Sequence, residues 1–426
     1  MKFETTRRRG VLILVLLLAV NIVNYIDRQL PYILVNAIRD ELGLSDAQFG
    51  LMAGTSYSLA FSVCALFLAR IADRFSARAV LSASLVIWSL MTTVSGFAQS
   101  FQHLVMARIG VGAGESGAMP SAHALIARIF PTQNHAFVYA VFSLAVPIGS
   151  TLGLMLGGWI NDSMGWRHAF FVIGLPGVLL AVLVWRVLPE LQAGQPVNPS
   201  QPSFTQVVRH MFGIRSYAHT TAACIVFGIA YFAMTVFGPA FLMRVHGQSA
   251  GQAGLALGIA SGLGGAVGIL GGGILADRLG RKDPRWRQFV PAIGVALCAP
   301  AALYAWLVPD VRTALLMLAL VHLLGMMCLA PTWANVQLLA PDDMRATAAA
   351  LLQFCILLVG ASLGPFAVGW LSDQLTPQFG AAGLRYALCG IAIFLVWASL
   401  HYYLAGRAMG HDLSPIEPLS SARAAA

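Results

Sequence analysis

Long apolar runs alternate with short polar turns along the whole chain. Twelve of these runs reach the length of about 20 residues that an α-helix needs to cross a bilayer. They lie near residues 11–34, 48–69, 79–98, 104–129, 136–160, 168–188, 217–243, 251–275, 289–308, 313–339, 346–371 and 384–405. The first run contains Asn21 and Asn24 and lacks a small-residue cleavage site, so we expect a retained helix and not a signal peptide.

The composition excludes most soluble classes of protein. Hydrophobic residues make up 58% of the 426 residues and charged residues only 10%, whereas soluble domains carry about 25% charged residues. An ordinary soluble enzyme, a disordered chain and a secreted disulfide scaffold are therefore excluded. The six cysteines stand singly in apolar runs, without CxxC or metal-ligand spacing, and we expect small core residues. We predict an all-α, multi-pass membrane protein without a cofactor or a metal.

The net charge of +9 reflects membrane topology rather than binding of nucleic acid. If the N-terminus lies inside the cell, 19 of the 26 Lys and Arg residues fall in cytoplasmic segments and five on the opposite side. The remaining two, Arg28 and Arg108, lie inside spans. Because cytoplasmic loops carry an excess of Lys and Arg, we expect both termini in the cytoplasm.

The chain contains an internal repeat. Residues 45–78 align with residues 249–282 at a constant offset of 204, and eleven of the 34 positions are identical. Both copies begin with S-x-x-Q, the capping-box pattern of a helix N-terminus. A six-helix unit used twice places a binding site between its two copies, near the middle of the bilayer.

The repeat divides the chain into two bundles and a linker. The longest polar stretch contains four prolines and separates the spans six and six. We predict twelve transmembrane helices in two pseudo-symmetric bundles. The bounds are an N-terminal bundle at 1–188, a cytoplasmic linker at 189–215, a C-terminal bundle at 216–406 and a cytoplasmic tail at 407–426.

Charged turns follow the second span of each half. They read ARIADRFSAR, from Ala69 to Arg78, and GILADRLGRK, from Gly273 to Lys282. This pattern resembles the signature loop of the major facilitator superfamily, and only the second copy matches it fully. A carboxylate held against a helix N-terminus and basic neighbours can latch one conformation. The gating candidates are Asp73, Arg74, Arg78, Asp277, Arg278 and Arg281.

Four charged residues lie inside predicted spans. Asp27 and Arg28 are on the first span, and Arg108 and Glu115 are on the fourth. A charge at a helix centre costs about 2.5–3.5 kcal/mol on insertion scales, so such residues mark ion or substrate pathways. The corresponding spans of the second half carry no charge at these positions, so the scaffold itself does not require them. A structural ion-pair network is the simpler alternative.

These four residues suggest proton coupling. A buried carboxylate such as Asp27 or Glu115 can gain a proton from one side of the membrane and release it on the other. Arg28 and Arg108 would hold an anionic group, because guanidinium suits carboxylate or phosphate. Asn24, Tyr25, Tyr231 and Trp333 are weaker candidates for substrate contact, and interhelical packing would explain each equally well.

Two motifs narrow the resemblance from the superfamily to one family within it. N-x-x-N-Y-x-D-R, from Asn21 to Arg28, and RIGVGAGESG, from Arg108 to Gly117, resemble the bacterial branch of the Spinster-like family. The resemblance implies that Asp27, Arg28, Arg108 and Glu115 serve proton coupling and binding of anionic, often lipid-like substrates. It also implies a bacterial inner membrane, and we expect a monomer. Organic-anion symporters of the same superfamily carry a similar pattern.

We therefore expect a proton-coupled secondary transporter that moves a small amphipathic or anionic solute by alternating access. The alternative is an organic-anion/proton symporter that takes up a sugar acid or carboxylate. A polytopic membrane enzyme is more remote, since no GxSxG, HExxH or phosphate-binding loop is present. A sensor is equally remote, because no appended soluble domain carries a signal. Substrate, direction and the identity of the coupling ion stay open.

Overall fold

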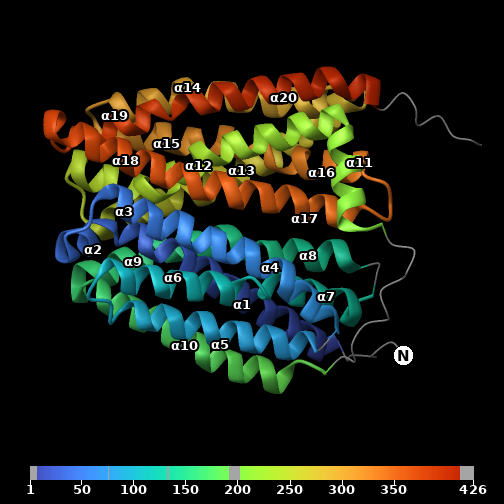
Figure 1. The fold of residues 1–426 in the computed structure, drawn as a ribbon, viewed down its shortest axis with the longest axis horizontal. Helices are drawn as coiled ribbons and strands as arrows, with labels where there is room; N and C mark the ends of the chain where they lie inside the picture. Colours follow the sequence, from blue (N-terminus) through green and yellow to red (C-terminus); the bar gives the residue numbers. More distant parts are fainter. Residues whose placement is uncertain (1–6, 75, 132–133, 191–201, 413–426) are drawn as a thin grey trace, which may run out of the picture.

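The computed structural model describes residues 7–74, 76–131, 134–190 and 202–412, without the side chains of residues 7, 66, 69–74 and 136. Helices make up the described elements, which confirms the all-α class. They lie side by side, with the N-terminal half in the lower part of Figure 1 and the C-terminal half above it.

The first half contains eleven labelled elements. They are α1 (Arg7–Ile33), α2 (Val35–Leu42), α3 (Asp46–Gly50), η1 (Leu51–Ser56), α4 (Tyr57–Arg74), α5 (Ala77–Ser95), α6 (Phe101–Glu115), α7 (Ala118–Ile129), α8 (His135–Ser143), α9 (Ala145–Met164) and α10 (Trp166–Val187). We call the end of the molecule that carries α2 the α2 end. The opposite end, where the described chain begins and finishes, is the terminal end (Figure 1).

The second half follows the same plan. It contains α11 (Phe204–Gly213), α12 (Arg215–His246), α13 (Ala250–Gly280), α14 (Trp286–Leu307), α15 (Val311–Met326), α16 (Leu329–Leu339), α17 (Arg345–Cys355), η3 (Ile356–Ala361), α18 (Ser362–Phe379), α19 (Ala382–Gly390) and α20 (Ala392–Asp412). Of the stretch predicted as linker, α11 forms the later part, and residues 191–201 lie outside the described residues. Of the predicted tail, α20 includes residues up to Asp412, and residues 413–426 lie outside.

Ten helical stretches of the described chain are long and apolar enough to cross a membrane. They correspond to ten of the twelve predicted spans. The other two spans, 48–69 and 104–129, are divided into shorter pieces: α3, η1 and α4 in one case, α6 and α7 in the other. The second of these carries Arg108 and Glu115, and the helix is interrupted directly after Glu115.

The predicted capping boxes are confirmed at the start of α3 and α13. In each, a serine hydroxyl accepts from the backbone N–H of a glutamine, whose side chain accepts from the serine N–H: Ser45 with Gln48, and Ser249 with Gln252. The same S-x-x-Q pattern therefore starts the same helix in both halves. The repeat is visible in the local structure as well as in the sequence.

A second feature that both halves share is an aspartate that caps a helix N-terminus of the other half at the α2 end. The Asp373 carboxylate of α18 accepts from the backbone N–H groups of Asp46 and Ala47, at 2.9 and 2.8 Å. In the equivalent place, Asp162 of α9 accepts from the Gly251 N–H at 2.8 Å. Carboxylates are stabilised at helix N-termini, where backbone N–H groups have no partner within the helix. Each half therefore caps a helix of the other.

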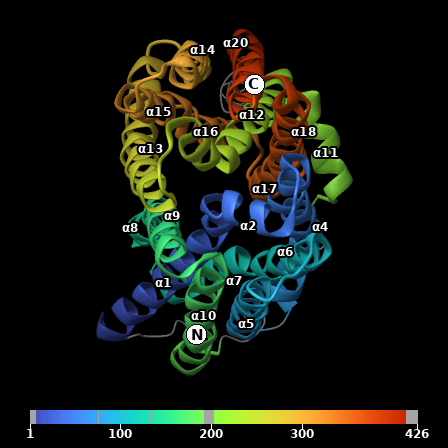
Figure 2. The ribbon, with the colours of Figure 1, turned by 90° about the vertical axis from the view of Figure 1, so that its left-hand side faces the viewer.

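Glycine lets the backbones meet at these two crossings. A Cβ at Gly158 of α9 would collide with the Ala250 backbone, and a Cβ at Gly369 of α18 would collide with the Asp46 backbone. Viewed from the α2 end, α9 meets α13 on one side, and α18 lies above the blue helices on the other (Figure 2). Small residues allow such close approach between helices in lipid.

One further contact at this end has no counterpart in the repeat. The Asp46 carboxylate accepts from the Arg244 guanidinium at 2.8 Å and from the Ser372 hydroxyl at 2.7 Å. Arg244 also donates to Asn36 at 2.7 Å, and Arg39 lies 3.3 Å from the carboxylate. Burial alone would favour the neutral acid, but these donors and two positive charges hold the pKa of the Asp46 carboxyl below its usual range. Asp46 therefore stays ionised and ties the two halves together.

Contacts between the halves thin out toward the terminal end. The inter-half hydrogen bonds of the described residues lie at the α2 end or near the middle, where Thr151 donates to Gly258 and Thr55 donates to Ser362. On α13, Gly254 and Gly258 pack against α9 of the other half. From Gly264 onward, the small face of α13 packs instead on α15 and α16 of its own half. The α2 end is thus the closed end of the molecule.

Two π-helical turns face each other across the interface. η1 lies in the second predicted span and η3 in the eleventh, and the two are in contact. Their helices cross where Gly54 packs against Ala361 and Pro365. A π turn bonds residue i to i+5, so it accommodates one extra residue and commonly occurs at functional sites.

Overpacking the crossing between α18 and α3 tests whether the two halves are tightly packed at the α2 end. We expect Gly369→Leu to push α18 away from the start of α3, because the new side chain cannot share space with the Asp46 backbone. Spin labels at residues 40 and 378, placed in a background without native cysteines, should shift to longer distances in pulsed electron resonance. Gly271→Leu is the control, since nothing lies within 4 Å of a Cβ there. An unchanged distance in Gly369→Leu would show that the crossing is not tight.

The Asp46 contact predicts a narrow pH dependence. A carboxyl with a depressed folded-state pKa contributes stability above its ordinary value near 3.8, and this is lost as the pH falls through the lower folded value. The same label distance should stay constant near neutral pH and lengthen only in strong acid. Asp46→Asn should remove that acid transition. Widening of the wild-type distance already near neutral pH would contradict this assignment.

Candidate functional site

The centre of the N-terminal half holds an ion pair that joins three helices. The Arg28 Nε of α1 donates to the Glu115 carboxylate of α6 at 2.7 Å. The Tyr57 hydroxyl of α4 donates to the same oxygen at 2.6 Å. The Glu115 side chain is fully buried, and that of Arg28 is 19% exposed. Two donors therefore hold one carboxylate oxygen, while the other, Oε1, has no hydrogen-bond partner among the described residues.

Aromatic rings surround the Arg28 guanidinium. Its carbon lies 5.2 Å from the centre of the Tyr25 ring, 5.6 Å from that of Tyr57 and 5.1 Å from that of Phe61. A cation over the face of an aromatic ring is attracted by about 0.5–2 kcal/mol, and more strongly where water is excluded. These rings therefore stabilise the Arg28 guanidinium beside its ion pair with Glu115.

The second carboxylate lies on the same helix as Arg28. Asp27 is buried and accepts from the Thr92 hydroxyl of α5 at 2.6 Å, and its Oδ1 has no partner among the described residues. Asp27 lies close enough to Glu115, Arg108 and Arg28 to interact with all three charges. The four predicted charges therefore form one cluster instead of facing lipid separately.

Arg108 is the exceptional member of this cluster. Its side chain is 1% exposed, yet none of its three guanidinium nitrogens has a hydrogen-bond partner among the described residues. Its guanidinium carbon lies 4.9 Å from the centre of the Tyr57 ring. A buried cation without hydrogen bonds is costly, and such groups persist mainly where they serve a ligand or an ion.

The weaker candidates divide into two groups. Asn24 is buried beside Asp27 with an unpaired amide nitrogen, and Tyr25 packs on Arg28, so both belong to the cluster. Tyr231 lies on α12 in the other half, near enough to Tyr25 for electrostatic interaction. Trp333 is partly buried on α16 and packs against the apolar core, and the described contacts give it no link to the four charges.

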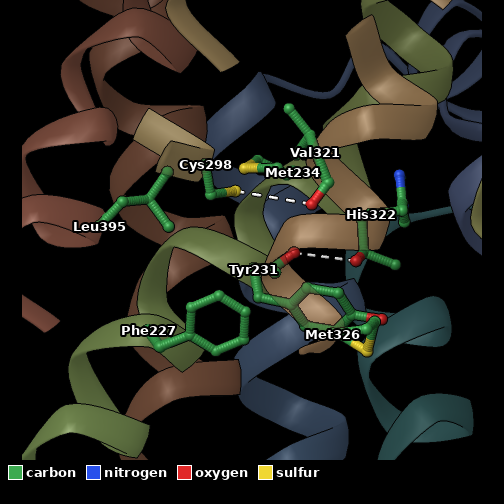
Figure 3. Close-up of a pocket in the computed structure, with 10 residues that line it drawn as sticks. Phe227, Tyr231, Met234, Cys298, Val321, His322, Met326 and Leu395 are labelled. Carbon is green, nitrogen blue, oxygen red and sulfur yellow. Dashed lines mark hydrogen bonds between the residues drawn. The ribbon is translucent and has the colours of Figure 1, made fainter. Parts of the chain in front are cut away.

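Tyr231 also lines a small apolar cavity inside the C-terminal half (Figure 3). Phe227 stacks on its ring at a centroid distance of 5.7 Å, and Met234, Met326 and His322 complete much of the wall. The cavity has a volume of about 10 Å³, room for about one water molecule. His322 is the base in its lining, and the acidic groups there are a weakly acidic thiol and a phenol. The surroundings of Tyr231 inside the C-terminal half are therefore mostly apolar.

Among the side chains that the structure describes, the gating candidates form no ion pair with one another. The side chains of Asp73 and Arg74 lie outside the described residues. Arg78 pairs with Glu190 at 2.8 Å and stacks on Trp185, which ties α5 to the end of α10 within one half. In the second copy, Asp277, Arg278 and Arg281 are exposed at the end of α13, and the described part of the chain shows no ion pair for them.

Sequence reasoning missed several residues that the structure assigns to these contacts. Thr92 and Phe61 complete the charged cluster, and their types are common in any membrane helix. Asp46 and Arg244 meet across the two halves, and Asp373 supplies the cap. All three stand in predicted loops or at span ends, where the sequence counted them only as surface charges.

No metal centre is visible in the described residues, which contain no group of three or more His, Cys, Asp or Glu side chains able to hold an ion. The six cysteines are free thiols, and three of them are buried. The chemistry available at the cluster is therefore that of carboxylates, guanidinium groups and phenol rings.

Known proteins resemble this chain over most of its length. The sequence profile of the Major Facilitator Superfamily matches residues 17–365. An "MFS-type efflux pump" of Mycolicibacterium smegmatis is 37% identical over 402 residues, covering 92% of each chain. The "Sphingosine-1-phosphate transporter SPNS2" of Xenopus tropicalis is 25% identical over 426 residues, covering 93% of this chain and 82% of the relative.

A solved structure shares the fold. A bacterial homolog of the human lysosomal transporter Spinster, in an inward-facing and unoccupied conformation, superimposes with a TM-score of 0.87. The match covers 96% of this chain and 99% of that one, at 24% sequence identity. The twelve-helix fold in two bundles is thereby confirmed.

The cluster predicts unequal effects of two arginine substitutions on stability. Arg28→Leu leaves Glu115 buried without its ion-pair partner, a change that typically costs about 3–5 kcal/mol. Arg108→Leu removes a cation that has no hydrogen bond among the described residues, so it should lower the free energy of unfolding less than Arg28→Leu does. Thermal unfolding of both variants in detergent measures this difference. Equal destabilisation by the two would show that Arg108 is a structural partner of the carboxylates.

Proposed function

The chain belongs to the Major Facilitator Superfamily, and on that premise we propose that it is a proton-coupled secondary transporter for an amphipathic solute with an anionic group. It is a multi-pass membrane transporter of the Spinster-like type and not an enzyme. The observation that carries the proposal is Arg108, a buried guanidinium that has no hydrogen bond among the described residues and lies in a cluster of two acids and two bases.

The charge balance of the cluster links a proton to the solute. With both carboxylates ionised, Asp27 and Glu115 balance Arg28 and Arg108, and the cluster is neutral. One proton on either carboxylate leaves a net positive charge in a region of low dielectric, where charges interact strongly. An anionic group on the solute, bound at Arg108, restores neutrality. Protonation and binding of the anion therefore favour each other.

The two carboxylates are suited to different parts of this cycle. Glu115 is held through one oxygen by two donors, Arg28 and Tyr57. Asp27 accepts one hydroxyl hydrogen bond and has an unpaired oxygen in the same buried space. We assign the exchangeable proton first to Asp27, and give Glu115 the role of sensing it through Arg28.

The apolar C-terminal wall favours an amphipathic solute over a small hydrophilic acid. Phe227, Met234 and Met326 beside Tyr231 are apolar side chains of the kind that contact an alkyl or aromatic body, although the space among them, about 10 Å³, is too small for a solute in this conformation. Guanidinium at Arg108 would bind the carboxylate or phosphate of the head. One relative is named as a sphingosine-1-phosphate transporter. Sphingosine-1-phosphate combines such a head and such a body, so this name supports the proposed class of solute.

Alternating access follows from the one closed end. With the α2 end sealed through Asp46 and Arg244, the solute enters from the terminal end, which we propose to be cytoplasmic with both chain termini. The bundles 1–188 and 216–406 then rock about the linker, as in transporters built from repeats. In the opposite state, the turns carrying Asp73, Arg74 and Arg78 and Asp277, Arg278 and Arg281 meet and close the terminal end. We propose a monomer in a bacterial inner membrane.

Charge-removing substitutions test the coupling. In liposomes with an imposed pH gradient, we expect Asp27→Asn and Glu115→Gln each to reduce gradient-driven transport by at least about 100-fold, since the proton site is lost. The probes are a lysophospholipid with a fluorescent tail and a short radiolabelled carboxylate. Asp342→Asn, on an exposed carboxylate, is the matched control and should transport normally.

The outcomes separate the proposal from its alternatives. Undiminished gradient-driven transport in both acid variants would exclude proton coupling at this cluster. Transport of the carboxylate but not of the lysophospholipid would favour an organic-anion symporter instead. A sodium gradient that replaces the pH gradient would overturn the assignment of the ion.

A further inference from the structure

A recess opens at the terminal end of the C-terminal half, away from the central cluster. It has a volume of about 570 Å³ and lies between the start of α12 and the end of α20. Its polar lining consists of Arg215 and His219 from α12, with Arg407, His411 and Asp412 from α20. Leu404, Ala408 and Gly213 supply the apolar part of the wall.

The recess is predominantly basic. Arg215 and Arg407 are exposed, and the described part of the chain shows no ion pair for either. Asp412 is the one acidic side chain in the lining, and its carboxylate is occupied by the backbone N–H of Ser216 at 2.7 Å. His219 is hydrogen-bonded to His401 at 3.1 Å. Among the described lining residues, two arginines therefore face one carboxylate, and neither arginine forms an ion pair with it.

The neighbouring helix α11 marks the depth of the recess in the membrane. It buries Val207 and Met211 against the bundle, while Phe204 and Phe212 are 48% and 43% exposed. A short amphipathic helix with exposed aromatic residues and a polar face lies in the plane of the membrane interface. Since α11 leads directly into α12, the recess lies at the level of the lipid headgroups.

An apolar stripe on α20 leads into the recess from the lipid side. Ile393, Val396, Leu400 and Tyr403 follow one another at helical spacing and are exposed by 69%, 58%, 53% and 45%. Arg407 comes one turn after Tyr403 on the same face. An occupant that uses both surfaces has an apolar chain along the stripe and an anionic head at Arg407. A free inorganic anion would use only the recess.

From these observations we propose that the recess binds the headgroup of an anionic phospholipid, with its acyl chain along the stripe of α20. The phosphate lies between Arg215 and Arg407, and His411 lines the same space. Basic pockets between transmembrane helices on the cytoplasmic side bind such headgroups. The site is separate from the transport cluster and does not depend on the nature of the solute. A bound lipid would join α12 to α20, the first and last spans of the C-terminal half.

The test compares lipid retention in the full-length protein. Purified protein in mixed micelles with equal amounts of phosphatidylglycerol and phosphatidylcholine is analysed by native mass spectrometry. The wild type should retain phosphatidylglycerol in preference. The double variant Arg215→Gln/Arg407→Gln should lose about tenfold or more of this preference, because both headgroup contacts are removed.

Two controls keep the result decisive. Arg186→Gln/Arg209→Gln removes the same number of positive charges at the terminal end, from exposed positions outside the recess, and should retain the preference. Arg407→Lys keeps the charge and should also retain it. An unchanged preference in the Arg215/Arg407 variant, or an equal loss in the control variant, would overturn the site. Displacement of the bound lipid by equimolar inorganic phosphate would overturn the lipid assignment in favour of a phosphate site.

Discussion

The bond between Arg28 and Glu115 is the interaction around which the N-terminal half is organised. It joins α1 to α6, and Tyr57 adds α4 through the same carboxylate oxygen. The Glu115 side chain is fully buried, and an unpaired buried charge costs several kcal/mol, so this carboxylate depends on Arg28. The pair thus fixes where Arg108 and Asp27 can lie. It also leaves Arg108 as the cation of the cluster whose nitrogens have no hydrogen bond among the described residues.

The sequence predicted the four charges because they break the strongest rule of membrane helices, and charges inside spans are rare. The capping boxes were equally predictable, since the spacing of Ser45 and Gln48 is a local signal. Thr92 could not be predicted as the partner of Asp27, because threonines occur throughout the spans and only the packing of α5 selects this one. The Asp46–Arg244 pair depends on how two halves dock, and spacing along one chain carries no such information.

The repeat separates what the scaffold needs from what the chemistry needs. Asp162 and Asp373 cap equivalent helices, Gly158 and Gly369 allow equivalent crossings, and these positions keep the same role in both halves. The charged cluster exists in the first half only, and so does the carboxylate of Asp46, whose equivalent is Ala250. Features shared by both halves hold the bundles together. Features found in one half carry the asymmetry that a directional transporter requires.

The π turn η1 has a consequence for the later residues of the second span. The second span contains η1, whereas its partner in the repeat, α13, is regular α-helix throughout, although the two align without a gap. One extra residue in a turn rotates everything after it by about 100° about the helix axis. Beyond the π turn, aligned residues of α4 and α13 therefore point to different sides of their helices. A rotation that superimposes the capping boxes of the two halves will not bring the later residues of these two helices onto equivalent faces.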